Sequence, residues 1–268
     1  MTAALRGFAL SRARLSRFVI YGGFLVIFGV FAIVLRDDGF ATPSNLLNIV
    51  QQTAPVTVMA VGMTFVLTAG EIDLSIGSVV AVAALLAAMA MREGAWPLGV
   101  LAGLAAGAGI GALNGALVAY ARLPSFLVTL ATMGVFAGVA RRLTALKSVP
   151  IESDLFNGLF GSGELFGVPS LFWWTLAAVA LGYYGLAQTR FGAHVLAMGD
   201  NARAARATGV AVPRLRFLVL TLSGTLAGLA GLLYAGRLHG ARYTLGEGDL
   251  LTVIAAVIVG GTRLNGGE

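Results

Sequence analysis

The sequence predicts an all-α fold, a polytopic integral membrane helical bundle with about eight transmembrane spans. Hydrophobic residues make up 58% of the 268 residues and charged residues only 11%, which leaves too little polar surface to cover a globule in water. Apolar runs close to the roughly 20 residues that cross a hydrocarbon core recur along the chain. Glycine is abundant, at 37 residues, and small side chains let membrane helices pack closely. The whole chain is therefore expected to form one transmembrane domain, residues 1–268.

Each apolar run between short polar segments is predicted to be one span. The eight predicted spans cover residues 18–35, 55–69, 76–91, 96–120, 125–146, 169–188, 217–236 and 250–261. Residues 42–52 mix polar and apolar side chains and are predicted to lie at the membrane interface or to dip into the protein. The second and eighth runs are short for a bilayer crossing.

The distribution of arginine predicts the orientation of these spans. Residues 1–17 contain several arginines and no acidic residue, and cationic residues are enriched on the cytoplasmic side of membrane proteins. We therefore expect a cytoplasmic N-terminal tail at 1–17 and a cytoplasmic polar stretch at 189–216. The polar segment 147–168 is expected on the outside.

Composition also excludes several classes of protein. The chain has no cysteine and two histidines, so a disulfide framework, a zinc site and a His-based catalytic triad are not expected. The only lysine, Lys147, is not preceded by the glycines of a phosphate-binding loop. The net charge of +6 comes from arginines dispersed between apolar runs, which does not indicate nucleic-acid binding. We expect no catalytic residue, cofactor or metal, and membrane lipid as the surroundings.

Four glycines in the fourth predicted span recur at every fourth residue, at Gly103, Gly107, Gly111 and Gly115. This spacing places them on one face of a helix. We expect that face to pack against another helix.

Two acidic residues lie between the second and third predicted spans, where the flanking apolar runs are too short to leave them in open water. Carboxylates at membrane depth are costly without a partner, which favours a functional role for Glu71 and Asp73. The alternative is that Asp73 and Ser75 cap the N-terminus of the third span, where their oxygens would accept hydrogen bonds from unpaired N–H groups. Both roles are compatible.

Residues 198–209 are predicted to form a short helix on the inner side, with Asp200 or Asn201 as the N-cap and Gly209 as the stop. Ala204 and Ala205 form a small apolar centre between two arginines. Such a helix could dock in a groove of a partner protein, or it could be a solvated helix near lipid headgroups.

Five segments together resemble the ribose-type permease family of bacterial ABC sugar importers, in order and spacing over nearly the whole chain. They are Thr68–Ser78 (TAGEIDLSIGS), Asn114–Gly115, Pro124–Met133 (PSFLVTLATM), Gly199–Gly209 (GDNARAARATG) and Ile254–Thr262 (IAAVIVGGT). This chain differs in having Glu71 where many relatives have glycine, and it ends before about two further spans of the family.

The resemblance implies a multi-pass permease subunit of the bacterial inner (plasma) membrane that provides the pathway for a sugar or a similar small polar solute. It implies three kinds of partner: cytoplasmic ABC ATPase subunits that hydrolyse ATP, a periplasmic or lipid-anchored sugar-binding protein, and a second permease subunit. The helix 201–209 then resembles the segment that couples the permease to the ATPase. The coupling residues implied are Asn201, Arg203, Ala204, Ala205, Arg206 and Gly209, and the pathway or structural motif comprises Glu71, Asp73, Ser75 and Asn114.

Two other functions remain open from the sequence. An ion-coupled secondary transporter would use Glu71 and Asp73 to bind protons or sodium near the midplane. A truncated, non-transporting membrane scaffold would suit the early end of the chain.

Overall fold

A computed structural model describes residues 21–264, 266 and 267, and the predicted N-terminal tail at 1–17 lies outside the described residues. The chain divides into two compact units, residues 1–49 and 50–268. In the first unit, the helix Tyr21–Val34 is followed by a turn in which Phe40 packs on Phe28 and Phe31. The second unit contains the bundle and every candidate site residue.

The prediction of an all-α membrane bundle is confirmed. Among the described residues, six helices are long and apolar enough to cross a membrane. They are α2 (Pro43–Thr68), α3 (Ile76–Glu93), α4 (Trp96–Ala119), α5 (Ser125–Thr144), α7 (Ser170–Ala187) and α9 (Val212–Arg237). Two of the eight predicted spans are shorter apolar helices, Tyr21–Val34 and α10 (Asp249–Val259). At 1.5 Å per residue, the 11 residues of α10 reach only about half of the roughly 30 Å core.

The placement of residues 42–52 at the membrane interface or dipping into the protein stays a prediction, and from Pro43 onward these residues belong to α2. This helix begins at Pro43 in the first unit and continues without a break to Thr68, with Pro55 inside it. Proline is tolerated in membrane helices because neighbouring groups satisfy the carbonyl that its missing N–H leaves free. With 26 residues, α2 is long enough to cross a bilayer, whereas its apolar run alone is not.

The polar stretch 189–216 is also more ordered than predicted. Residues Arg190–Ala207 form α8, and α9 already begins at Val212, five residues before its apolar run. Arg214 and Arg216 therefore extend from the first turns of α9 rather than from a loop.

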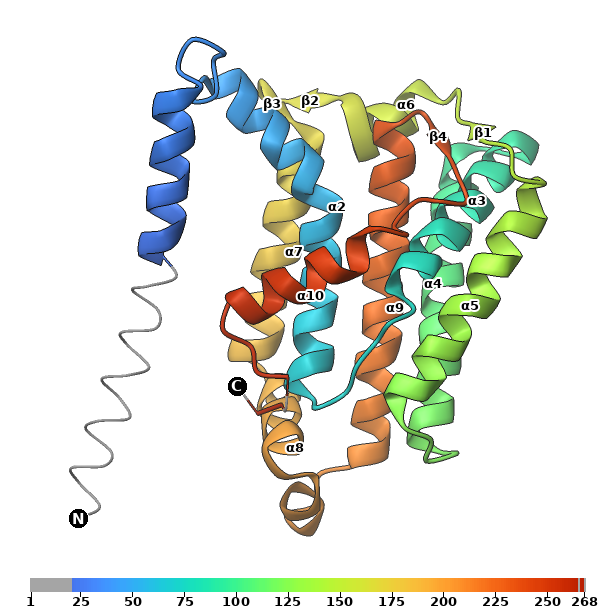
Figure 1. The fold of residues 1–268 in the computed structure, drawn as a ribbon. Helices are drawn as coiled ribbons and strands as arrows, with labels where there is room; N and C mark the ends of the chain where they lie inside the picture. Colours follow the sequence, from blue (N-terminus) through green and yellow to red (C-terminus); the bar gives the residue numbers. More distant parts are fainter. Residues whose placement is uncertain (1–20, 265, 268) are drawn as a thin grey trace. The chain divides into compact units, whose positions relative to one another are not determined.

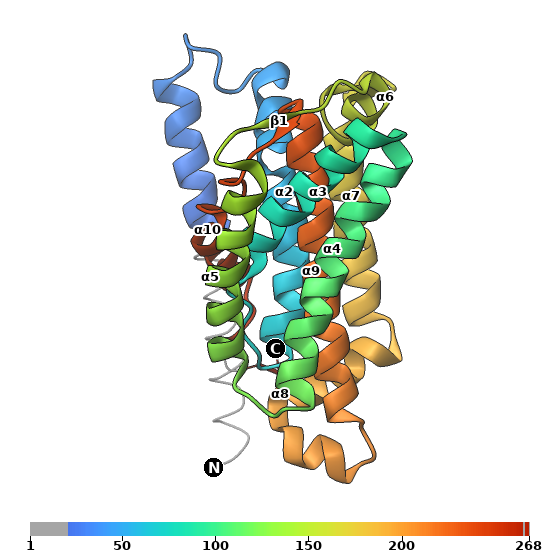
Figure 2. The same ribbon diagram turned by 90° about the vertical axis from the view of Figure 1, so that its right-hand side faces the viewer.

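The packing of α4 against α9 forms the centre of the bundle, and Figure 2 shows these two helices side by side. A methyl group at Gly111 would lie 2.5 Å from the carbonyl oxygen of Leu220, and one at Gly115 would lie 2.7 Å from that of Phe217. Gly107 meets the backbone of Gly224 and Gly228 on α9, and Gly103 meets the side chain of Leu232. The predicted packing of the four-glycine face is confirmed, and both helices contribute glycines to it.

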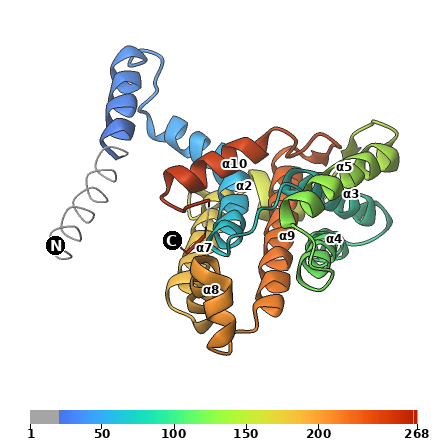
Figure 3. The same cartoon turned by 60° about the horizontal axis from the view of Figure 1, so that its bottom comes forward.

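Short elements close the two ends of the second unit (Figure 1). At one end lie β1 (Val149–Pro150), α6 (Asp154–Asn157), the π-helical turn η1 (Gly158–Ser162), β2 (Glu164–Leu165) and β3 (Val168–Pro169). Here β1 pairs antiparallel with β4 (Gly240–Ala241), and β2 pairs with β3. At the opposite end lies α8, which comes forward in Figure 3. The two ends of the second unit are thus closed by different elements.

Two segments of the second unit do not cross it as continuous helices. After α2, residues 69–75 run back into the bundle without regular structure, and α3 starts partway along it (Figure 1). After β4, the chain turns at 242–248, and α10 runs obliquely for only part of the bundle's length. Non-helical backbone at membrane depth occurs where it is buried in protein or lines a cavity, so these segments are the first places to look for a site.

Candidate functional site

The break between α2 and α3 contains two carboxylates, and each has its own partner. Gly70 has a positive φ of 74°, which turns the chain at the end of α2. Glu71 is buried, and its Oε1 lies 2.6 Å from Nε of Arg216 on α9. Removal of one partner of a buried ion pair is strongly destabilising because it leaves an uncompensated buried charge, so Glu71 depends on Arg216. The sequence gives no sign of this partner, which is 145 residues further along the chain.

Asp73 is the centre of a buried polar network that joins three helices. One carboxylate oxygen, Oδ1, accepts hydrogen bonds from the backbone N–H of Ser75 (3.0 Å) and from the Ser75 hydroxyl (2.7 Å). The other oxygen, Oδ2, accepts one from the hydroxyl of Ser223 on α9 (2.8 Å). The amide of Asn114 on α4 donates to Ser75 Oγ (2.9 Å). The network therefore fixes the start of α3 against α4 and α9.

The capping role predicted for Ser75 is only partly right. Ser75 does occupy the N-cap position of α3, but its side chain accepts no hydrogen bond from the first turn. Its hydroxyl proton goes to Asp73 instead. Three of the four predicted motif residues, Asp73, Ser75 and Asn114, are thus brought together, while Glu71 forms a separate ion pair.

The segment predicted to be a short inner helix is the second half of α8. Asn201 interrupts α8 with extended backbone angles (φ −154°, ψ 97°). Its Oδ1 accepts hydrogen bonds from the N–H groups of Arg203 (3.1 Å) and Ala204 (3.0 Å). The helix ends at Ala207, and Gly209, with a φ of +91°, turns the chain just after its C-cap Thr208. Of the two N-caps predicted, Asp200 or Asn201, the structure shows Asn201 in this role, and the predicted stop at Gly209 is confirmed.

The two alanines at the centre of this helix face in different directions. Ala205 is 4% exposed and packs into the hydrophobic core, so its expected position on the surface is wrong. Ala204 is exposed, as are Arg203 and Arg206. The surface that a partner could reach is thus formed by Arg203, Ala204 and Arg206, while Ala205 anchors the helix to the bundle.

This helix is connected by close backbone packing to the break that carries Glu71 and Asp73. Gly199 lies two residues before Asn201, and a methyl group there would collide with the carbonyl of Thr68, the last residue of α2. The backbone N–H of Gly267 donates to the same carbonyl (3.0 Å). The backbone just before the helix at 201–207 is therefore packed directly against the end of α2.

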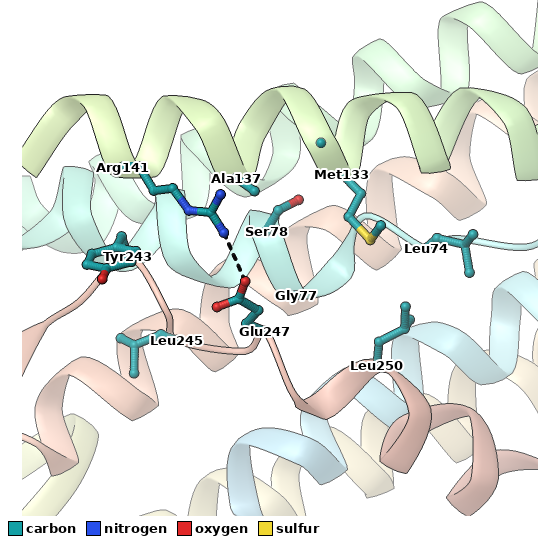
Figure 4. A pocket seen from close by; sticks show the side chains of 11 residues that line it. Leu74, Gly77, Ser78, Met133, Ala137, Arg141, Tyr243, Leu245, Glu247 and Leu250 are labelled. Carbon is teal, nitrogen blue, oxygen red and sulfur yellow. Dashed lines mark hydrogen bonds and ion pairs between the residues drawn. The ribbon is translucent and has the colours of Figure 1, made fainter. Parts of the chain in front are cut away.

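A cavity of about 360 Å³ lies between α3, α5 and the segment 243–250. Figure 4 shows Arg141 of α5 and Glu247 of the turn meeting across it, with Nη2 and Oε1 3.1 Å apart. Tyr243 and Ser78 also line it. Sequence reasoning missed this cavity, because Arg141 and Glu247 are 106 residues apart and neither belongs to a recognisable motif.

Nothing in the described part of the chain indicates a metal centre, since no group of three or more histidine, aspartate or glutamate side chains there could hold an ion. The carboxylates of the break interact with hydroxyls, one backbone amide and one guanidinium. These contacts are suited to holding helices in place.

Comparison with known proteins gives consistent results. The family described as branched-chain amino acid transport system / permease component matches residues 45–267. The ribose import permease protein RbsC of Escherichia coli K12 is 41% identical over 237 residues, which are 87% of this chain and 74% of that protein. RbsC of Bacillus subtilis 168 is 36% identical over 250 residues, 92% of this chain and 78% of that protein.

A third relative is the L-arabinose ABC transporter permease protein AraH of Azospirillum brasilense. It is 34% identical over 245 residues, which are 91% of this chain and 71% of that protein. No solved structure matches the chain.

Proposed function

We propose that this chain, which belongs to the branched-chain amino acid transport system / permease component family and is thus a permease component of an ABC importer, carries a small sugar. The observation that carries this proposal is the similarity to ribose and arabinose permeases, at 34–41% identity over most of the chain. These relatives are named as transport permeases, which supports a role for the chain without enzyme activity of its own. The long apolar helices fit a multi-pass protein of that membrane.

The energy for transport enters, in this proposal, through the second half of α8. Three features support it as the contact with a cytoplasmic ABC ATPase: it lies at one end of the bundle, its exposed face combines a small alanine with two arginines, and it follows directly on Gly199. Ala204 would permit close approach to a groove, and Arg203 and Arg206 would meet acidic groups at its rim. The N-cap residue Asn201 and the stop residue Gly209 set the length of this contact.

Movement of this helix would then reach the solute pathway through the end of α2. Gly199 leaves no space between α8 and the Thr68 carbonyl, and interfaces that are packed this closely shift as units. The break at 69–75 would transmit the shift to α3, which the Asp73 network ties to α4 and α9. Alternating access follows when ATP-driven closure of the ATPases moves α8 and reopens the pathway on the other side.

The remaining components of the proposed importer follow from the family. A sugar-binding protein, periplasmic or lipid-anchored, would deliver the solute to the end that carries β1–β4, and a second permease subunit would complete the pathway. The N-terminus and α8 would be cytoplasmic, and the chain would act as one permease domain. The exposed apolar face of α5, which includes Leu127, Leu130 and Val135, is available to lipid or to the second subunit.

Uptake by the reconstituted importer tests the proposed function. The chain is incorporated into proteoliposomes with a candidate ABC ATPase and a candidate sugar-binding protein from the same organism, and uptake of labelled D-ribose and L-arabinose is measured with and without ATP. We expect sugar uptake that requires both ATP and the ATPase. L-leucine serves as the comparison solute because the family description names branched-chain amino acids.

Two results would contradict the proposal. Uptake of L-leucine but of no sugar would identify a different solute. Uptake that continues without the ATPase and stops when an ionophore collapses the ion gradient would identify an ion-coupled carrier. The structure offers that carrier little support, since Glu71 and Asp73 are both occupied by partners within the protein.

A further inference from the structure

The cavity between α3, α5 and the segment 243–250 has the size and composition of a small-molecule site. Its volume of about 360 Å³ falls within the range of about 300–1,000 Å³ that is typical of ligand pockets. Most of its wall is apolar, and its few polar groups converge on one region (Figure 4). This combination is what distinguishes a binding site from a packing defect.

We propose that this cavity binds a neutral polyol during transport, with one hydroxyl group hydrogen-bonded to a free N–H of Arg141 and a neighbouring hydroxyl to Glu247; the inference rests on the proposed function and names a site for its solute. Neither the proposed coupling residues at 201–209 nor Glu71, Asp73, Ser75 and Asn114 line the cavity. The site is therefore distinct from the ATPase contact and from the Asp73 network.

The charges of the cavity favour a neutral ligand. Among the residues that the structure describes, Arg141 and Glu247 are the only charged ones lining the cavity, and they form an ion pair at 3.1 Å. An anion would compete with Glu247 for the guanidinium, and a cation would compete with Arg141 for the carboxylate. A neutral ligand meets no net charge and leaves the ion pair in place.

The hydrogen-bonding capacity of the pair matches that of a diol. A guanidinium can only donate and an ionised carboxylate can only accept, whereas each hydroxyl of a sugar does both. Among the described residues, only one hydrogen bond joins the pair, from Arg141 Nη2 to Glu247 Oε1. The side chains remain 51% and 57% exposed, so other N–H groups and Oε2 are open to a ligand. Hydrogen bonds to charged groups are about twice as strong as neutral ones.

The remaining walls suit the body of a sugar ring. Tyr243 offers an aromatic face beside Arg141, and Leu245, Leu250 and Met133 offer apolar contacts to ring C–H groups. The hydroxyl of Ser78 donates to the carbonyl of Ser75 (2.8 Å), which leaves its oxygen free to accept a hydrogen bond from a ligand.

The first turn of α3 and the turn at 243–248 pack closely on each other because both have a glycine at the contact. A methyl group at Gly77 would collide with the carbonyl of Gly246, which itself has a positive φ of 76°. The turn that carries Glu247 is therefore pressed against the first turn of α3. This contact fixes Glu247 opposite Arg141 and preorganises the pair, which lowers the cost of ordering on binding.

A thiol-protection experiment tests the site directly, because the chain contains no cysteine. Ala137, which lines the cavity one helical turn before Arg141, is replaced by cysteine (Ala137→Cys). The importer complex carrying this change is placed in nanodiscs and labelled with N-ethylmaleimide in the presence of D-ribose, L-arabinose, D-xylose or D-galactose. Ser148→Cys, at an exposed serine outside the cavity, is the matched control.

We expect at least one of these sugars to slow labelling at position 137 in a saturable way and to leave labelling at position 148 unchanged. Inorganic phosphate and L-leucine should protect neither position. Adding Glu247→Gln or Arg141→Gln should raise the sugar concentration for half-protection about tenfold or more, since each removes a charged hydrogen-bond partner. Unchanged labelling of position 137 without sugar would show that these variants keep the fold.

Specific outcomes overturn the proposal. If none of the four sugars protects position 137, the cavity is not the solute site, even where the wild-type importer takes up sugar and the proposed function stands. Protection by phosphate or by L-leucine contradicts a neutral polyol as ligand. Protection that is unaltered in Glu247→Gln and Arg141→Gln contradicts the role of the ion pair. Absence of sugar uptake by the wild-type importer overturns the proposed function. Whether the cavity binds sugar is decided by the protection result alone.

Discussion

At the scale of single residues, the most informative position is Asp73, since it satisfies three donors on two other residues at once. Its carboxylate accepts the N–H and hydroxyl of Ser75 and the hydroxyl of Ser223. All three side chains are buried, so water cannot replace the hydrogen bonds that are lost when Asp73 is substituted. The cost of leaving a buried donor unpaired is about 1–3 kcal/mol.

The first prediction concerns this residue. Asp73→Ala removes every acceptor of the network and is expected to destabilise the protein by several times that single-group cost. Asp73→Asn should largely preserve stability, because the amide oxygen can accept from Ser75 while the amide nitrogen donates to the Ser223 oxygen. Folded yield and the thermal unfolding temperature in detergent measure the stability of both variants. Equal losses in the two variants would show that charge, rather than hydrogen bonding, holds the network.

The second prediction separates two neighbouring alanines. Ala204→Glu adds bulk and negative charge on the exposed face of the helix, so it should abolish ATP-dependent uptake and weaken co-purification with the ATPase, while folded yield is unchanged. Ala205→Glu places a carboxylate in the core and should lower folded yield itself. Arg203→Ala should weaken assembly only modestly, because an exposed ion pair contributes at most about 1 kcal/mol.

The comparison of the two alanine variants tests whether this helix couples the permease to the ATPase. If Ala204→Glu retains full ATPase binding and full uptake, the assignment of residues 201–209 as the coupling segment is wrong. If Ala205→Glu folds as well as the wild type, the inward packing of Ala205 is not important for stability.

At the scale of elements, the α4 and α9 contact depends on the absence of side chains. Gly107 packs against the backbone of Gly224 and Gly228, and backbone atoms cannot move aside without separating the helices. In lipid, such association is driven by close packing and not by the exclusion of water. The glycine face is thus a primary source of stability for the bundle.

The third prediction follows from this packing. Gly107→Leu should prevent normal assembly of α4 with α9 and strongly reduce the yield of monodisperse protein in size-exclusion chromatography. Gly109→Leu is the matched control, because position 109 lies on the same helix with no heavy atom within 4 Å of an added methyl group. Comparable yields of the two variants would mean that α4 and α9 can move apart without loss of the fold.

At the scale of the whole molecule, the orientation in the membrane remains a prediction with a direct test. Ser153 precedes α6 at one end of the bundle, and Thr208 follows α8 at the other. Single cysteines at these positions can be labelled with an impermeant thiol reagent in intact cells. We expect labelling of Ser153→Cys without permeabilisation and of Thr208→Cys only after it, because arginines are enriched on the cytoplasmic side. The reverse pattern would invert the topology.

The parts of the fold that sequence predicted well are those set by local chemistry. The four-residue glycine spacing predicted a packing face because helical periodicity alone determines which residues share a face. Asn201 and Gly209 were identifiable as helix boundaries because capping depends on the nearest few residues. By contrast, the boundary of α2 was missed because the tertiary structure tolerates Pro55 and continues the helix through it.

The site residues divide in the same way. Asp73, Ser75 and Asn114 were found from the motifs that they belong to, but Ser223 and Arg216 were not, because no local signal connects them with the break. The direction of Ala205 could not be predicted, since both alanines have the same neighbours in sequence. Arg141 and Glu247 gave no signal at all, and their pairing depends on how the turn at 243–248 returns to α5.

The sequence by itself determined the class of this protein, since composition decides the solvent that surrounds it and periodicity decides which faces of its helices pack. Only the tertiary structure decided what each polar residue does. It paired Glu71 with Arg216, turned the Ser75 hydroxyl to Asp73, directed Ala205 inward and placed Arg141 opposite Glu247. The reason is physical. Apolar burial is summed over many residues, so composition is enough to predict it. A hydrogen bond or an ion pair requires two particular groups within about 3 Å, and that distance is set by the packing of helices far apart in the chain.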